Sequence, residues 1–164
     1  MKYLNISIGI FIALAASRFV PHPPNFTSLI ALSFYVPILF GKRYLLIVIL
    51  AFAITDLYFG FHNTLLFTWF SVLIIGLIST FFKKGLYFRM SGAALGALAF
   101  FVITNFGVWA TGMYGYTFDG LIACYTLAIP FFAYSLIATF IFSTIIEFLY
   151  KYKSNLIIKN ILIK

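Results

Sequence analysis

The chain has 164 residues, of which 64% are hydrophobic and only 9% are charged, and its mean hydropathy is +1.11. A soluble domain has about 25% charged and about 45 to 50% apolar residues, so this composition cannot cover a water-facing surface. It excludes a cytosolic enzyme, a secreted disulfide-linked domain and a nucleic-acid-binding protein. The single cysteine, Cys124, excludes an intrachain disulfide and a thiolate metal cluster. The composition therefore predicts an integral membrane protein with one helical domain.

Charged residues divide the chain into apolar segments that are long enough to cross a bilayer, which takes about 20 residues, with a usual range of about 17 to 25. Between Lys2 and Lys42 the only charged residue is Arg18, which lies beside a proline-rich run at residues 21–25. Proline in this run prevents one continuous helix. We therefore expect two spans in this part of the chain, and the second of them is short.

The remaining apolar segments are separated in the same way, by a turn at residues 60–63 and by a loop rich in Gly and Tyr at residues 112–120. The six predicted spans are residues 4–20, 27–40, 44–59, 64–82, 91–111 and 121–149. We expect an all-α bundle of six transmembrane helices in three hairpins, forming one membrane domain over residues 1–150. Residues 151–164 alternate Lys and Asn with Leu and Ile, which predicts either a basic amphipathic cytoplasmic tail or a solvated one.

Basic residues give the expected orientation of these spans. Ten of the eleven basic residues fall before the first span, after the last, or in the loops on the same side. Basic loops face the cytoplasm, so we expect both termini inside and only Arg18 outside, in the inner membrane of a bacterium. An alternative is that the first segment is a signal peptide with a cleavage site near residues 13–15, which would leave five spans.

Apart from the basic residues, polar and interfacial aromatic side chains gather at the outer ends of the predicted spans. This distribution fits an outward-facing ligand pocket better than a pore, which places ionisable groups through the full membrane depth. The candidate ligand-binding residues are Arg18, His22, Asn25, Asp56, His62, Asn63, Asn105, Trp109, Tyr116 and Asp119.

Several of these residues have a structural interpretation as well. Asp56 needs a partner inside its span, and either Arg18 or His62 is at the right level. Such a pair either locks two helices together or orients a ligand. Trp109 and Tyr116 either stack on a flat ligand or belong to the aromatic belt at the membrane surface. We expect no metal site, because the two histidines lack a metal-ligand spacing such as H-x-x-x-H.

Small residues recur every four positions in two of the predicted spans. Gly9, Ala13 and Ser17 lie in the first, and Gly92 and Gly96 lie in the fifth. This spacing allows helix backbones to approach closely. Each stripe therefore either packs inside the bundle or faces a partner protein.

The stretch ASRFVPHPPNFT at residues 16–27 resembles the first-loop motif of an uncharacterised bacterial family of small membrane transport proteins. That family in turn resembles the substrate-binding S components of energy-coupling-factor (ECF) vitamin transporters. The basic turn at residues 41–43 and the Asp-Leu-x-x-Gly segment that ends at Gly60 fit the same pattern. The resemblance is close over about the first 65 residues and rests on the span count beyond them.

The resemblance implies a six-helix bundle that holds a vitamin or vitamin precursor near its outer face. It implies that Arg18, His22, Pro24 and Asn25 form the pocket or its lid. It also implies that Gly9, Ala13 and Ser17 form a docking face for a transmembrane coupling protein driven by two cytosolic ATPases.

Taken together, these observations predict a membrane transport protein that captures a small nutrient at the outer face for uptake. We expect neither catalysis nor a cofactor, and the chain lacks the Gly-Lys-Ser/Thr loop that an ATPase would need. One alternative is a structural or scaffolding membrane protein of the cell envelope without a transported ligand. Another is a membrane enzyme with His22 or His62 as its base, but no Ser or Cys nucleophile can be placed beside either.

Overall fold

The computed structural model describes residues 2–162, and within this range the chain forms six α-helices, one short 3-10 helix and no strand. The predicted all-α fold is therefore confirmed. The helices are α1 (Lys2–Phe19), α2 (Leu29–Phe40), η1 (Lys42–Tyr44), α3 (Leu45–Phe59), α4 (Leu65–Ser79), α5 (Leu86–Ala110) and α6 (Phe118–Leu162).

Each predicted span corresponds to one of the six α-helices, and the largest differences lie in α5 and α6. Helix α5 begins five residues earlier than the predicted 91, directly after Gly85, whose φ of 73° ends the preceding loop. Helix α6 continues to Leu162 because no Gly or Pro follows residue 150, so the predicted tail does not begin at a helix end. The predicted amphipathic character of residues 153–164 concerns side chains outside the part of the chain that the structure describes.

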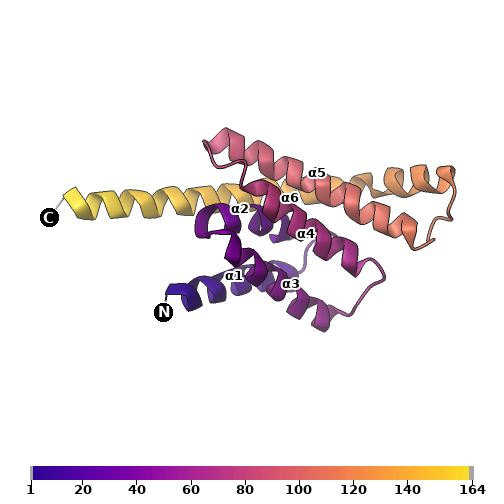
Figure 1. The fold of residues 1–164 in the computed structure, drawn as a ribbon, viewed down its shortest axis with the longest axis horizontal. Helices are drawn as coiled ribbons and strands as arrows, with labels where there is room; N and C mark the ends of the chain where they lie inside the picture. Colours follow the sequence, from indigo (N-terminus) through magenta and orange to yellow (C-terminus); the bar gives the residue numbers. More distant parts are fainter. Residues whose placement is uncertain (1, 163–164) are drawn as a thin grey trace.

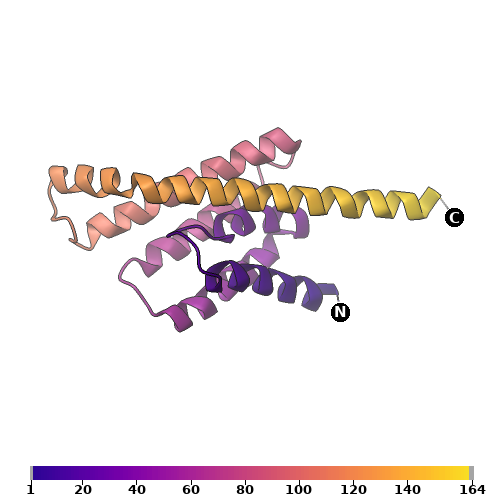
Figure 2. The same cartoon turned by 180° about the vertical axis from the view of Figure 1, so that it is seen from behind.

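The helices do not pack as three consecutive hairpins, which corrects that part of the expectation. Of the three predicted hairpins, only α5 and α6 pack extensively, side by side in both views (Figures 1 and 2), and α4 packs against α5 rather than against α3. Helix α1 packs mainly against α3, and α2 packs against α4, α5 and α6. The reason is that the proline-rich connection after α1 carries the chain into the bundle. As a result, α2 is the central helix, and its residues from Leu29 to Pro37 are all buried.

The two chain ends lie toward the same end of the bundle, whereas the α3–α4 and α5–α6 loops lie toward the opposite end (Figure 1). We call these the terminus end and the loop end. At the terminus end the Arg43 guanidinium lies 4.1 Å from the ring centre of Tyr3, so the turn before α3 covers the start of α1. Loop and chain ends are thus distributed as the predicted orientation requires.

The two stripes of small residues behave differently. In α5, Gly92 and Gly96 are buried, and a Cβ atom added to Gly92 would lie 2.6 Å from the rings of Phe34 and Phe82. The α5 stripe is therefore needed for close helix packing. In α1, by contrast, Gly9 is exposed, and a Cβ atom there would meet nothing within 4 Å.

The length of α2 decides the shape of the bundle. At a rise of about 1.5 Å per residue, its 12 residues span about 18 Å, whereas the 25 residues of α5 span about 37 Å. Ile30, at the start of α2, lies beside Gly96 near the middle of α5. The half of α5 nearest the loop end therefore has no α2 beside it, and a space remains there.

Candidate functional site: a cavity above α2

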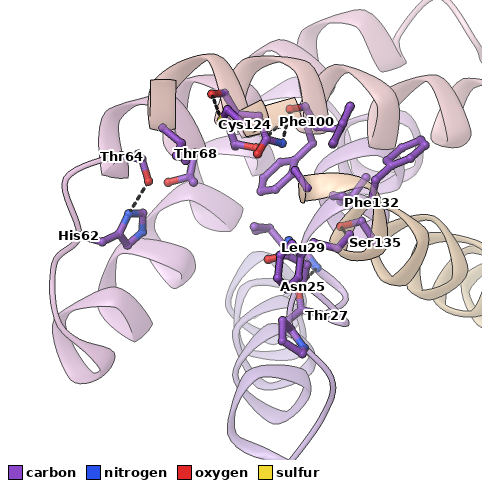
Figure 3. A pocket seen from close by; sticks show the side chains of 18 of the residues that line it. Asn25, Thr27, Leu29, His62, Thr64, Thr68, Phe100, Cys124, Phe132 and Ser135 are labelled. Carbon is purple, nitrogen blue, oxygen red and sulfur yellow. Dashed lines mark hydrogen bonds between the residues drawn. The ribbon is translucent and has the colours of Figure 1, made fainter. Parts of the chain in front are cut away.

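The space above α2 is a cavity of about 630 Å³. Leu29 and Ile30 at the start of α2 form its floor, and side chains from α1, α3, α4, α5 and α6 form its walls. Figure 3 shows side chains from these separate segments arranged around the common space. The exposed loop residues Asn25 and His62 are among the lining residues at the loop end. The cavity therefore opens at the loop end of the bundle.

The proline-rich segment between α1 and α2 forms one edge of this opening. Ser28 is buried and anchors the segment to α1, because its Oγ atom donates to the carbonyl of Ala13 and lies 2.8 Å from Ser17 Oγ. Asn25 has a φ of 63°, a left-handed conformation that asparagine tolerates better than most residues. The resulting tight turn brings His22, Pro24 and Asn25 to the cavity wall.

Arg18, which lines the cavity, is held by an ion pair between α1 and α3. Arg18 Nη1 lies 2.7 Å from Asp56 Oδ1, and Trp69 Nε1 of α4 donates to Asp56 Oδ2 at 2.8 Å. Arg18 Nη1 also donates to the hydroxyl of Thr55. Because a buried carboxylate is costly without partners, the 1% exposure of Asp56 is explained by this set of contacts. Of the two partners expected for Asp56, the structure selects Arg18.

Two aromatic rings fix the position of the Arg18 guanidinium. Its Cζ atom lies 4.6 Å from the ring centre of Phe52 and 5.2 Å from that of Phe59. Cation–π contacts of this kind favour an arginine over a more strongly hydrated lysine. Arg18, Phe52 and Phe59 all line the cavity. The wall thus presents a guanidinium group whose orientation is set by ion pairing and by stacking.

Deeper in the cavity the walls are mainly apolar and come from α5 and α6. Phe101 and Phe132 pack with ring centres 4.8 Å apart, and Phe100 and Phe131 complete this aromatic part of the wall. Polar atoms in the same region are few and are partly used within their own helices. For example, Asn105 Nδ2 donates to the carbonyl of Phe101. The cavity therefore combines a polar mouth with an aromatic interior.

The structure brings together some of the candidate residues but not all of them. Six line the cavity, namely Arg18, His22, Pro24, Asn25, His62 and Asn105. Asp56 lies behind Arg18 and supports it without facing the cavity. Four others do not line it, namely Asn63, Trp109, Tyr116 and Asp119.

The four residues outside the cavity belong to the loop end for other reasons. Asn63 and Asp119 are exposed. The Trp109 ring packs against Phe106 and Tyr116, and its Nε1 atom donates to the carbonyl of Thr117. Trp109 therefore fastens the connection between α5 and α6. Position along the chain placed these residues at the correct end, but it did not show which side of each helix faces the cavity.

Other lining residues were not expected from the sequence, among them Thr68, Thr104, Cys124 and Ser135. Each is a small polar residue on one face of a largely apolar helix. Such positions in α4, α5 and α6 can indicate the side of a helix that faces a cavity, because a lipid-facing position rarely needs a polar side chain. The signal is weak, since a helical Ser or Thr commonly donates to its own backbone, as Ser135 does to Phe131.

The proposed docking stripe on α1 is divided by the structure. Gly9 and Ala13 are exposed, whereas Ser17 is half-buried and contacts Ser28. Within residues 2–162, no group of three His, Cys, Asp or Glu side chains is arranged to hold a metal ion.

The fold and the cavity define a class of protein: an all-α bundle with a large cavity that opens at one end. The chain belongs to a family of unknown function, DUF6580, whose model matches residues 2–156. No similar curated protein and no similar solved structure was found.

Proposed function

We propose that the chain is a multi-pass protein of the bacterial inner membrane that captures a small molecule in the cavity above α2 for uptake. The observation that carries the proposal is the cavity itself, because its volume and its aromatic walls are typical of ligand sites, which measure about 300 to 1,000 Å³. A bundle this small has no structural need for such a space. A full-length second helix would fill it.

Two helical segments among the described residues are long and apolar enough to cross a membrane. They are Leu86–Ala110, with a mean hydropathy of 1.8, and Phe118–Tyr152 of α6, with a mean hydropathy of 2.0. Helices α1, α2 and α4 are shorter and also apolar. Most residues of the two long helices are not buried within the bundle, and exposed Leu, Ile and Phe side chains cover the outer surface. A lipid environment accounts for this surface. The loop end would then face outward, because the basic residues lie at the terminus end.

The resemblance to ECF S components supports the same function. In this proposal the exposed part of the α1 stripe, Gly9 and Ala13, docks a transmembrane coupling protein that cytosolic ATPases drive. Gly9→Leu would then reduce uptake and the recovery of the coupling protein. The cavity would remain intact, because Gly9 does not line it and a Cβ atom added to Gly9 would meet nothing within 4 Å.

Native mass spectrometry of protein purified in mild detergent tests the proposal most directly. We expect a small molecule to remain bound and to be lost in Ala128→Phe, which fills the cavity because Ala128 lines it. Ala133→Phe is the matched control, since Ala133 lies on the same helix and is exposed. Protein that is reproducibly free of ligand in all three forms would contradict the proposal.

A structural role in the cell envelope is the second candidate. It is favoured by the ion pair at the cavity mouth, because Asp56 is fully satisfied by Arg18 and Trp69 without any ligand. His22→Ala separates the two functions, because His22 lines the cavity. Within the described residues, the His22 ring makes one hydrogen-bonding contact, between Nδ1 and the carbonyl of the adjacent Pro23. Loss of the bound molecule with unchanged folding supports capture. Retention of every phenotype by this variant and by Ala128→Phe supports the scaffold.

A further inference from the structure

Among the described residues, the cavity wall holds one cationic side chain, Arg18, and no anionic one. Arg18, His22 and His62 line the cavity, and no Asp or Glu does so within the described residues. The nearest carboxylate, Asp56, is buried, and both of its oxygen atoms are occupied by Arg18 and Trp69. A cation in the cavity would therefore meet a guanidinium group and no free carboxylate. An anion would meet the opposite sign of charge.

The Arg18 guanidinium is only partly used by the protein. Nη1 makes the contacts to Asp56, Thr55 and the carbonyl of Phe52. Within the described residues, Nε and Nη2 donate no hydrogen bond to the protein. These two groups form the edge of the guanidinium that matches a carboxylate in a two-point contact. Stacking on Phe52 and Phe59 holds this edge in place before any ligand binds.

We propose that the captured molecule is an amphipathic carboxylic acid whose carboxylate binds Nε and Nη2 of Arg18. Its apolar or aromatic body lies deeper in the cavity, against Phe100, Phe101 and Phe132. This inference rests on the proposed function and names the chemical class of its ligand. His22 and His62 at the mouth add ring nitrogens that can donate hydrogen bonds to the carboxylate from the same side.

The shape of the cavity supports this orientation. Arg18, His22 and His62 lie at the loop end, at the end of α1 and in the loops, whereas the paired rings of Phe101 and Phe132 form the wall from within α5 and α6. A molecule with its acidic group at Arg18 would bury its apolar part and leave no charge in the aromatic interior. The reverse orientation would place a carboxylate beside these rings, where an unpaired charge is costly.

Cys124 provides a built-in reporter for the test. It is the only cysteine of the chain and it lines the cavity. The rate at which N-ethylmaleimide modifies Cys124 in detergent-purified protein, followed by intact-mass measurement, reports whether the cavity is occupied. The probes are 4-phenylbutyrate, its primary amide and 4-phenylbutylamine, which share one apolar body and differ in the head group. The thermal unfolding midpoint with each compound is a second readout.

We expect the acid to protect Cys124 at a concentration at least about tenfold lower than the amide, and the amine to give no protection. In Arg18→Lys the charge beside Asp56 is kept but the two-point edge is lost, so the difference between acid and amide should fall below about threefold. If Arg18→Lys does not fold, the double variant R18Q/D56N removes both charges together and should show the same loss. Asp119→Asn is the control, because Asp119 is exposed and lies outside the cavity.

Equal protection by the amide or the amine in the unchanged protein would overturn the carboxylate inference while leaving ligand capture intact. Persistence of the acid preference in both Arg18 variants would overturn the role of Arg18. If no compound alters labelling or unfolding and the purified protein carries no molecule, the proposed function itself fails.

Discussion

Arg89 at the start of α5 and Glu147 on α6 form a two-point ion pair, with Nε to Oε1 at 2.5 Å and Nη2 to Oε2 at 2.7 Å. The pair lies toward the terminus end, where Arg89 Nη1 also donates to the carbonyl of Lys83 in the α4–α5 loop. It therefore ties together α5, α6 and the loop before α5. Arg89 is one of the ten basic residues on which the expected orientation rests, and its charge is matched by Glu147.

Glu147→Gln should destabilise the protein by about 1.5 to 3 kcal/mol, the usual value of a hydrogen bond to a charged group. The side chains are 15% and 13% exposed, so solvent does not fully replace the lost contact. The measurement is the free energy of unfolding in mild detergent. The exchanged pair R89E/E147R should recover part of the loss. A Glu147→Gln protein as stable as the original would mean that the pair contributes nothing to folding.

Arg18 and Asp56 should show strong energetic coupling. Asp56→Asn leaves the guanidinium without its carboxylate, and Arg18→Gln leaves a buried carboxylate with Trp69 as its remaining side-chain donor. Each single change should be costly, and the double variant should cost less than the sum of both, with a coupling of about 0.5 to 3 kcal/mol. A double-mutant cycle from chemical unfolding measures it. Additive effects would show that the two charges act independently.

Gly9→Ala and Gly92→Ala should have opposite effects, although they are the same substitution within α-helices. At Gly92 the new Cβ atom would press on Phe34 and Phe82, which should destabilise the protein by about 1 to 3 kcal/mol. At Gly9 nothing lies within 4 Å, so the better helix propensity of alanine should be neutral or stabilise by up to about 1 kcal/mol. Thermal unfolding of both variants checks this. Equal effects would show that the close approach at Gly92 is not needed.

The orientation of the bundle can be tested with single cysteines in a Cys124→Ser background. Asn63 lies in the α3–α4 connection at the loop end and Lys84 lies in the α4–α5 loop, and both are exposed. In intact cells a membrane-impermeant maleimide should label Asn63→Cys but label Lys84→Cys only after the membrane is opened. The opposite pattern would reverse the proposed orientation, and the cavity would then open to the cytoplasm.

The helices themselves were predictable because charge and hydropathy act locally. Every predicted span corresponds to a helix, and Gly60 ends α3 at the predicted residue because its φ of 93° favours glycine. Long-range packing was not predictable in this way. Nothing near Arg89 in the sequence indicates its contact with Glu147, 58 residues away.

The candidate site was likewise predictable where local sequence decides the structure, and not where long-range packing does. His22, Pro24 and Asn25 line the cavity because a proline-rich segment at a helix end has few ways to turn. Trp109 and Asp119 lie in helices at the same end but do not line the cavity. Position along the chain gives the level of a helical residue, but not which side of its helix faces the cavity. The depth of the cavity depends on α2, and the sequence showed only that this segment is short.

In the proposed uptake, the 12-residue length of α2 would also set how far a captured molecule has travelled. A molecule that rests on Leu29 and Ile30 lies level with the middle of α5, because Ile30 lies beside Gly96. It has then passed about 21 Å of the 25-residue helix, counted from Ala110 at about 1.5 Å per residue. Only the length of α2, about 18 Å, separates it from the terminus end. Displacing this one central helix would complete the crossing.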